Sequence, residues 1–530
     1  MVQADRMAKS FQQILNRFDG GMTNLLRADN VRNARKVTHF DIFSDPTKMK
    51  PYPDFAATTT DSGTIATIKL VRFIPAESAS NGAATVFALG QSTVTANAPK
   101  IYQKTTIAGA WDVALGTNGT EVMSERVMIE FKRNLLGWRS DAAASISGAH
   151  LDGSTSKMWR YPITTGTWAT DWTDATMNTA LYIAQPIVHS KDDRLYIPFD
   201  NYIYYHTGVT MTDNPQLGLT LPTNLIITSI CEYGNYLAIA CRSKVPMNRN
   251  SVVYLWDRDA SKGEVTESID FGPEDLELID VLDGALVGVS VLRNSYSDVI
   301  TFDPYISFKY YPGGIQSARQ FLQLPFSVTG QRIIDSQKIN NRLLFLMSGT
   351  LDGDSTQTDG IWSLAKIGDR FAVTIEYLYN NDTAITSGIP KGFLRFGDFV
   401  IAAFTDGGTY KCNQLSSATF VSSAPSYETV IFNGGDAAQT KKFLKGTLIT
   451  EPLPAAGSAT LAYKADAETS FTTILTHSID DAIRKDTVNV AGAANLPEFQ
   501  EKAYKITSTG NAVITGLKFV YDEVTGKDAT

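Results

Sequence analysis

The five histidines have the widest chemical range of any residues in this chain, and their spacing does not fit a metal or proton-transfer site. They are His39, His150, His189, His206 and His477. Paired histidines that hold a metal ion on one element typically lie four residues apart, and no two of these do. A lone histidine near a strand end is usually structural, so we predict no catalytic or metal-binding role for any of them.

Nucleophilic and phosphate-binding motifs are missing from the sequence. It contains no G-x-S-x-G nucleophile elbow, no P-loop and no G-x-G-x-x-G turn. The three cysteines, Cys231, Cys241 and Cys412, follow neither a metal-ligand spacing nor a disulfide framework. We therefore expect buried free thiols, which suit assembly in a reducing cytoplasm.

Acidic turns are the next candidates for chemistry. Asp359 and Asp406 each begin an Asp-Gly turn before an aromatic strand, and both turns weakly resemble the Asp-boxes of sialidase blades. The serine that completes such a box is missing upstream of both, and Asp-Gly is also what a tight hairpin turn requires. Glycosidases need two facing carboxylates, and the 55 acidic residues of the chain single out no such pair.

The loop that starts at Asp352 matches a calcium-binding loop in the spacing of its first acidic residues, but its later positions do not match. Its sixth position is Gln357, where the turn needs glycine, and its twelfth is Ser363, where the ion needs a bidentate glutamate. We therefore predict no metal site, no cofactor and no enzymatic activity for the chain.

A hairpin unit recurs along most of the sequence. Each copy has an apolar strand, a tight turn, a second apolar strand, a polar loop and a short aromatic strand. The period is about 53 residues, which is typical of β-propeller blades, each a four-stranded antiparallel sheet. We predict an all-β chain with a six- to seven-bladed β-propeller over residues 56–425. The turns are Asn81-Gly82, a degenerate Arg133-Asn134, Asp192-Asp193, Gly234-Asn235, Asp283-Gly284, Asn340-Asn341 and Gly397-Asp398.

The two ends of the chain lack this repeat. Apolar residues within 4–18 are spaced as in an amphipathic helix, which Gly20-Gly21 would end. Residues 22–55 are expected to form an extended basic arm, so that 1–55 is one N-terminal segment. The helix either packs on its own domain or docks on a neighbouring subunit. Residues 426–530 contain alternating apolar segments that predict a C-terminal β-sandwich.

Charge is distributed unevenly along the chain, whose net charge is −8. Residues 1–50 hold nine Lys/Arg and five Asp/Glu, a net of +4, which leaves −12 on the rest. A mostly acidic body argues against ordinary nonspecific nucleic-acid binding, which needs a basic face. The sequence shows no signal peptide and no apolar run of transmembrane length, so we expect cytoplasmic assembly without a membrane-spanning segment.

Short motifs near both ends resemble tail proteins of double-stranded DNA bacteriophages that carry a propeller. The run Phe18-Asp-Gly-Gly-Met22, the arm 26–35 and the segments 452–464, 497–500 and 514–521 carry this resemblance. It implies a structural virion protein of the tail or head–tail nozzle, built as a ring of copies and involved in genome ejection. The implied partners are further copies of the chain, other tail, adaptor or portal proteins, and double-stranded DNA that passes without specific binding. The implied location is the virion tail, after assembly in the host cytoplasm.

The resemblance implies no catalytic residue, but the N-terminal segment supplies candidates for contacts between subunits. Two other functions stay open. One is a carbohydrate-binding host-adhesion protein at the tail tip, which would bind glycans through residues 426–530 or through the long loops 245–250 and 348–358 on one rim of the propeller. The other is a glycosidase propeller, against which the incomplete Asp-boxes argue. The candidate contact residues are Phe11, Ile14, Leu15, Phe18, Gly20, Gly21, Met22, Arg27, Arg32 and Arg35.

Overall fold

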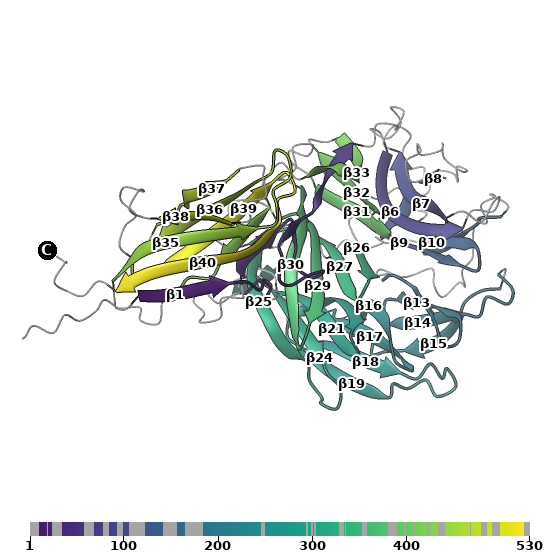
Figure 1. Ribbon diagram of the computed structural model, residues 1–530. Helices are drawn as coiled ribbons and strands as arrows, with labels where there is room; N and C mark the ends of the chain where they lie inside the picture. The colour runs from purple at the N-terminus through teal and green to yellow at the C-terminus, as the bar shows by residue number, and fades with distance from the viewer. Residues whose placement is uncertain are drawn as a thin grey trace, which may run out of the picture. The chain divides into compact units, whose positions relative to one another are not determined.

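A computed structural model describes the chain as an all-β protein (Figure 1). The described residues contain no α-helix, and accordingly none of their elements is a helix long and apolar enough to cross a membrane. The described ranges are 10–18, 20–23, 34–57, 68–77, 84–92, 99–104, 122–140, 156–164, 184–211, 213–244, 250–292, 295–297, 300–301, 304–327, 333, 335–351, 358–379, 389–396, 399–406, 409–420, 425–432, 440–466, 468–478, 485–489 and 499–523.

Residues 56–360 and 385–414 form one compact unit, which we call the meander unit. Its described strands follow one another as seven antiparallel meanders. The first meander consists of β6 (Ile68–Glu77), β7 (Ala84–Ser92) and β8 (Pro99–Lys104), and the second of β9 (Val122–Phe131), β10 (Asn134–Ser140) and β11 (Ser156–Pro162). The third consists of β12 (Ile187–His189), β13 (Arg194–Phe199), β14 (Tyr202–His206) and β15 (Gln216–Thr220). The fourth consists of β16 (Leu225–Tyr233), β17 (Tyr236–Ser243), β18 (Ser251–Trp256) and β19 (Glu267–Gly272).

The fifth meander is β20 (Asp275–Leu282), β21 (Ala285–Leu292), β24 (Tyr305–Tyr311) and β25 (Arg319–Ser327), with the small hairpin β22 (Ser295–Ser297) and β23 (Ile300–Thr301) and the short strand β28 (Thr350–Leu351) beside β25. The sixth is β26 (Asp335–Ile339) and β27 (Arg342–Met347). The seventh is β31 (Ile389–Phe396), β32 (Phe399–Asp406) and β33 (Thr409–Phe420), whose last residues lie outside this unit.

Each meander packs on the next, and the last packs on the first. Buried apolar clusters join the first four meanders and the fifth in sequence. The fifth and sixth are joined by an ion pair of 3.7 Å between Lys338 Nζ and Asp280 Oδ1. The sixth and seventh are joined by the Arg395 backbone N–H, which donates to Gln337 Oε1 at 2.8 Å. A buried cluster that includes Ala88 and several seventh-meander side chains completes the circle. The unit is therefore propeller-like, a circle of antiparallel sheets.

Local turn chemistry explains why the hairpins close where the sequence predicts them. Asp193, Asp283, Asn340 and Asn341 have positive φ angles of 53°, 48°, 47° and 58°. Tight hairpin turns need such angles, and Asp, Asn and Gly adopt them most easily. The predicted turns at Asn81-Gly82 and Gly397-Asp398 lie outside the described residues.

Residues 1–55, 361–384 and 415–530 form the second compact unit, which we call the sandwich unit. One of its sheets has the order β1 (Ser10–Leu15), β40 (Ile514–Glu523), β35 (Lys441–Thr450) and β38 (Lys485–Asn489). The other continues from β29 (Gly360–Ile367) and β30 (Arg370–Leu378) through β2 (Ala34–Thr38), β34 (Ser426–Thr429), β39 (Lys502–Thr509), β36 (Ser458–Ala465) and β37 (Thr472–His477). The pair β3 (Phe40–Asp41) and β4 (Lys50–Pro51) and the strand β5 (Pro53–Ala57) follow β2 in the chain.

Aromatic residues fill the space between the two sheets of the sandwich. Tyr504 on β39 stacks on Phe519 on β40, with ring centroids 3.7 Å apart and an interplanar angle of 11°. Beside this pair, Lys502 is only 2% exposed. Its Nζ lies 3.9 Å from the ring centroid of Phe499 and 4.3 Å from that of Phe443. This Nζ has no hydrogen-bond partner among the described residues, and burial lowers the pKa of the Lys502 ammonium from 10.5 to about 7.

The predicted N-terminal helix was wrong. Residues 10–15 form strand β1, which pairs antiparallel with β40 so that Phe11 faces Tyr521 and Leu15 faces Leu517 in register (Figure 1). A short apolar run fits both the helical and the strand period. A short isolated helix is only marginally stable in water, so pairing with the edge of β40 overrides helix propensity.

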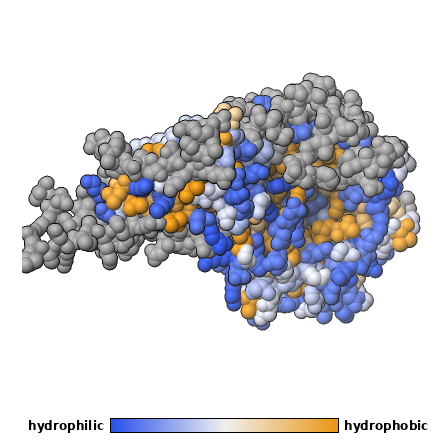
Figure 2. All heavy atoms as spheres, in the orientation of Figure 1, coloured by the Kyte–Doolittle hydropathy of each residue, from blue (hydrophilic) through white to orange (hydrophobic). Residues whose placement is uncertain are grey.

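The candidate contact residues fall into three groups. Leu15, Phe18, Gly21 and Met22 are buried within the sandwich unit, and Gly20 is half-buried in a turn. Ile14 is 48% exposed, and Arg35 is exposed on β2. The side chain of Phe11 and the residues Arg27 and Arg32 lie outside what the structure describes. On the face shown in Figure 2 the described surface is largely hydrophilic, with hydrophobic residues in a few groups.

The two units begin and end at other residues than the predicted domains, which were 1–55, 56–425 and 426–530. The N-terminal segment 1–55 belongs with residues 415–530, and residues 361–384 also belong to this sandwich unit. Strands β1 and β2 each extend one of the two sandwich sheets. The two sheets of the sandwich unit therefore contain strands from both ends of the chain.

Candidate functional site

The meander unit contains a cavity of ≈ 450 Å³ among the first strands of five meanders. Ile74 on β6, Met128 on β9, Ile187 on β12, Asp335 on β26 and Phe393 on β31 all line it. The first strand of a meander is the one nearest the middle of a circle of sheets, so the cavity lies on the inside of this circle. Concave sites of this size commonly hold small ligands.

Asp335 is the one buried carboxylate in the described cavity wall. It is 6% exposed, and its Oδ1 accepts the backbone N–H of Ser336 at 2.8 Å. Its Oδ2 accepts the backbone N–H of Phe393 at 3.4 Å. Because these amides come from β26 and β31, the carboxylate both joins two meanders and is fixed in orientation.

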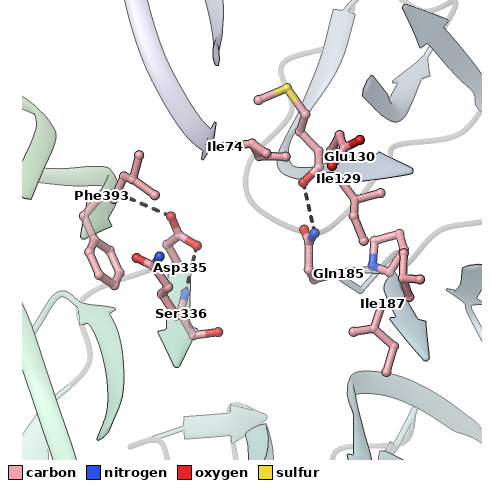
Figure 3. A pocket seen from close by; sticks show the side chains of 13 residues that line it. Ile74, Ile129, Glu130, Gln185, Ile187, Asp335, Ser336 and Phe393 are labelled. Atoms are coloured by element: carbon pink, nitrogen blue, oxygen red, sulfur yellow. Dashed lines mark hydrogen bonds between the residues drawn. The ribbon is translucent and has the colours of Figure 1, made fainter. Parts of the chain in front are cut away.

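Gln185 lies across the cavity from Asp335, together with Glu130 and Ile187 (Figure 3). Its Nε2 donates to the carbonyl oxygen of Met128 at 3.0 Å, which orients the amide. Its Oε1 is buried and has no hydrogen-bond partner among the described residues. A buried acceptor without a donor costs free energy, and it is therefore a natural point of attachment for a ligand or a water molecule.

Two other polar side chains of the wall are already engaged. Gln337 donates to the Arg395 carbonyl oxygen and accepts from the Arg395 N–H, both at 2.8 Å, and so mimics a strand pairing. Glu130 Oε1 accepts the backbone N–H of Arg133 at 3.1 Å and thus caps a turn. No lysine, arginine or histidine is among the residues that line the described wall. The described wall therefore carries two carboxylates, those of Asp335 and Glu130.

A second polar cluster lies between the third and fourth meanders and has a structural role. His189 is fully buried, and its Nδ1 accepts the backbone N–H of Lys191 at 3.2 Å. Its Nε2, 3.4 Å from the carbonyl oxygen of Tyr236, then carries the proton and donates it there. Burial, and then the neighbouring Arg258, lower the pKa of His189. This neutral histidine connects β12 to the β16–β17 hairpin.

The remaining candidates from the sequence do not gather into a site in the described structure. His39 and His206 are buried, and burial lowers the pKa of both. The cysteines Cys231, Cys241 and Cys412 are buried and free, as predicted. No group of three or more His, Cys, Asp or Glu that could hold a metal ion occurs among the described residues. The calcium-like loop 352–357 and His150 lie outside the described residues.

The two turns that weakly resemble Asp-boxes differ in what the structure describes. Asp359 is 1% exposed, and its Oδ1 accepts from the Ser348 hydroxyl at 2.6 Å and the Gly349 N–H at 2.8 Å. It therefore closes a loop within the chain, and burial raises its pKa. Asp406 ends strand β32, and the glycines that follow it lie outside the described residues.

Sequence comparisons find no match: no family model and no curated protein matches the chain. Among solved structures, an exo-β-1,3-galactanase from Phanerochaete chrysosporium with galactose aligns with 89% of this chain and 100% of its own, at 6% identity and a TM-score of 0.32. YCF48 bound to D1 peptide covers 69% of this chain and 96% of its own, at 10% identity and a TM-score of 0.41. The β-propeller domain of the Trilobed protease from Pyrococcus furiosus covers 58% and 89%, at 10% identity and a TM-score of 0.33.

The prediction that the chain is not an enzyme was wrong as a firm exclusion. The solved structures that match it include glycoside hydrolases along most of its length, so a fold of this kind does not rule out catalysis. At these identities and TM-scores the matches assign neither an activity nor a substrate to this chain. What the cavity can do chemically follows from its own residues.

Sequence reasoning missed the cavity entirely. Asp335 and Gln185 are 150 residues apart in the sequence, and neither belongs to a motif. The one available signal is position: both stand at the start of the first apolar strand of a repeat, which in a propeller faces the centre. Aligning the repeats by their hairpin turns would have selected such positions.

Proposed function

We propose that the chain is a structural protein of a bacteriophage tail or head–tail nozzle, and that copies of it form a ring that helps build the DNA exit conduit. In this proposal the meander unit is a seven-bladed β-propeller that serves as a platform. The sandwich unit carries the motifs that resemble phage tail proteins. The location would be the virion tail, with further copies and other tail, adaptor or portal proteins as partners.

The observation that supports this proposal is how the run from Phe18 to Met22 is built into the sandwich unit. Phe18 is fully buried and packs edge-on against Tyr427, with ring centroids 5.5 Å apart. Gly21 has a φ of +62°, and a Cβ there would lie 2.7 Å from the Cβ of Ala372. Met22 is 4% exposed. Packing and backbone conformation therefore restrict which residues can stand at Phe18, Gly21 and Met22, as expected for a motif with a structural role.

Charge gives a physical route to a ring. A closed ring needs heterologous contacts, in which one patch meets a different patch on the next copy. The segment 1–50 carries +4 and the rest of the chain −12, and complementary charge favours contact between the two on different copies. An acidic conduit wall would also repel DNA phosphates, so that the duplex slides rather than binds.

Mass photometry with electron microscopy of the full-length chain, alone and with purified tail or portal partners, tests the proposal. Closed rings are expected in at least one of these mixtures. Because β1 and β2 extend the sandwich sheets, deleting the N-terminal segment would damage folding as well as assembly. Substitutions on its exposed face are therefore the better probes.

Ile14→Asp and Arg35→Glu should reduce ring formation while the monomer stays folded. Arg370→Glu is the matched control, because it reverses one charge on another exposed position of the sandwich unit. A chain that remains monomeric with every partner present would refute the structural role. Rings that form equally well with all three variants would refute the involvement of the N-terminal segment.

A further inference from the structure

Exposed apolar side chains on two strand edges carry an inference that rests on the proposed ring and names the surfaces that join its copies. Among the residues whose burial the structure describes, three large hydrophobic side chains are exposed: Ile14, Val209 and Leu217. Ile14 lies on β1, Leu217 on β15, and Val209 in the loop that precedes β15. We propose that the edge of β1 in one copy of the chain pairs with the edge of β15 in the next copy.

Both strands stand at the edge of their sheets. β1 pairs with β40, and no other described strand pairs with it. β15 is likewise the last strand of the third meander, with β14 as its one described neighbour (Figure 1). An edge strand presents backbone N–H and C=O groups that can bind a strand of another chain. β1 has six residues and β15 has five, so the two edges match in length.

Neither edge has the features that usually prevent pairing between chains. Natural edge strands are commonly protected by charged side chains or by proline. The segments of β1 and β15 contain no charged residue and no proline. The corresponding fourth strand of the next meander, β19, carries Glu267 and Asp270, both exposed. Of these two fourth strands, β15 is therefore the one whose edge is open to a partner strand.

The distribution of the exposed side chains identifies a second copy of the chain as the partner. A ring needs two different patches on each subunit. Ile14 supplies one in the sandwich unit, and Val209 with Leu217 supplies another in the meander unit. Pairing of the two edges on different copies would remove Ile14 and Leu217 from water.

Charge agrees with this pairing. Residues 10–18 contain one charged residue, Arg17, and residues 207–220 contain one, Asp213. Both side chains are exposed. The two edges therefore carry opposite charges, which favours the contact of β1 with β15 over the contact of either edge with its own copy.

Leu217→Lys tests the β15 edge in the mixture where the native chain forms rings. Leu217 is 51% exposed, so the substitution should leave the monomer folded, as near-ultraviolet circular dichroism would verify. It places an unpaired ammonium at every contact, so mass photometry should count at least tenfold fewer rings at equal protein concentration. Ser268→Lys adds the same charge at an exposed position of β19 and should assemble like the native chain.

Cysteine cross-linking tests whether the two edges meet. Chains with Ile14→Cys and chains with Leu217→Cys are mixed under ring-forming conditions and treated with a short bismaleimide, while the native cysteines are buried. We expect a covalent dimer that contains one chain of each kind. Either chain alone should give no dimer, and Ser268→Cys in place of Leu217→Cys should give none.

The outcomes separate this contact from the ring itself. A native chain that stays monomeric with every partner refutes the ring and the contact together. Rings that form equally well with Leu217→Lys, or rings in which Ile14→Cys and Leu217→Cys do not cross-link, refute the contact of β1 with β15 and leave the ring standing.

Discussion

Replacing Lys502 by methionine should make the sandwich unit more stable near neutral pH and should remove a large part of its pH dependence. The Lys502 ammonium is buried, lies near the faces of four aromatic rings and has no hydrogen-bond partner among the described residues. Burial lowers its pKa from 10.5 to about 7. Methionine keeps the length and the apolar contacts but has no charge to desolvate.

The sign and size follow from proton linkage. Between pH 7 and pH 10.5 the folded state has lost the Lys502 proton and the unfolded state still holds it, so the free energy of unfolding rises with pH in this window. A shift of about 3.5 units corresponds to about 5 kcal/mol at full extent. The ring faces attract the ammonium by up to ~2 kcal/mol and so reduce this amount. We expect a rise of about 3–5 kcal/mol for the native chain that the Lys502→Met chain lacks.

Differential scanning calorimetry from pH 6 to pH 10 is the assay, because it resolves separate transitions of the two units. The informative quantity is the difference in midpoint between the native chain and Lys502→Met at each pH, since other titrating groups cancel. This difference should be several degrees in favour of Lys502→Met at pH 6 and should shrink toward pH 10. Lys442→Met, at an exposed position on strand β35 of the other sandwich sheet, should show no such trend. A difference that does not change with pH would refute the reasoning.

Two further predictions concern the sandwich unit. Gly21→Ala should destabilise it by about 1–3 kcal/mol, because φ is +62° and the new Cβ would lie 2.7 Å from the Cβ of Ala372. Gly234→Ala in the meander unit is the control, because Gly234 has a similar φ but open space around it, and it should cost only about 1 kcal/mol. Equal losses of stability in calorimetry would contradict the packing argument. Burial lowers the pKa of His39 to about 3, so as the pH falls below about 6.5 the unfolded protein protonates this histidine before the folded protein does. The free energy of unfolding should therefore decrease between pH 6.5 and pH 3. His39→Asn should lessen this decrease in acid unfolding followed by circular dichroism.

Local chemistry made the repeats predictable from the sequence. The turns at Asp192-Asp193 and Asn340-Asn341 combine residues that tolerate positive φ with apolar strands on both sides, and the structure closes hairpins at both. A residue's turn preference depends mainly on its own backbone, so it is visible without tertiary information. The same holds for the alternating strand from Leu517 to Tyr521, which lies in β40.

Features that depend on distant partners were not predictable in this way. Residues 10–15 became a strand because the edge of β40, about five hundred residues later in the sequence, offers pairing. Phe499 and Tyr504 lie close to Lys502 in the sequence, but nothing nearby shows that Phe443 on β35 and Tyr463 on β36 also lie against its ammonium. The cavity has the same origin, because Asp335 and Gln185 meet only when the meanders close into a circle.

The sharing of the sandwich between both chain ends sets an order for its formation during synthesis. Of the described strands, β1 leaves the ribosome first and its partner β40 leaves it last. All strands of the meander unit emerge between them and can pair with neighbours in the sequence as they appear. A chain cut short before residue 514 would leave β1 and β35 without the strand that lies between them. Completion of this sheet therefore distinguishes a chain that contains β40 from one cut short before it, and the shorter products would expose unpaired strand edges to quality control.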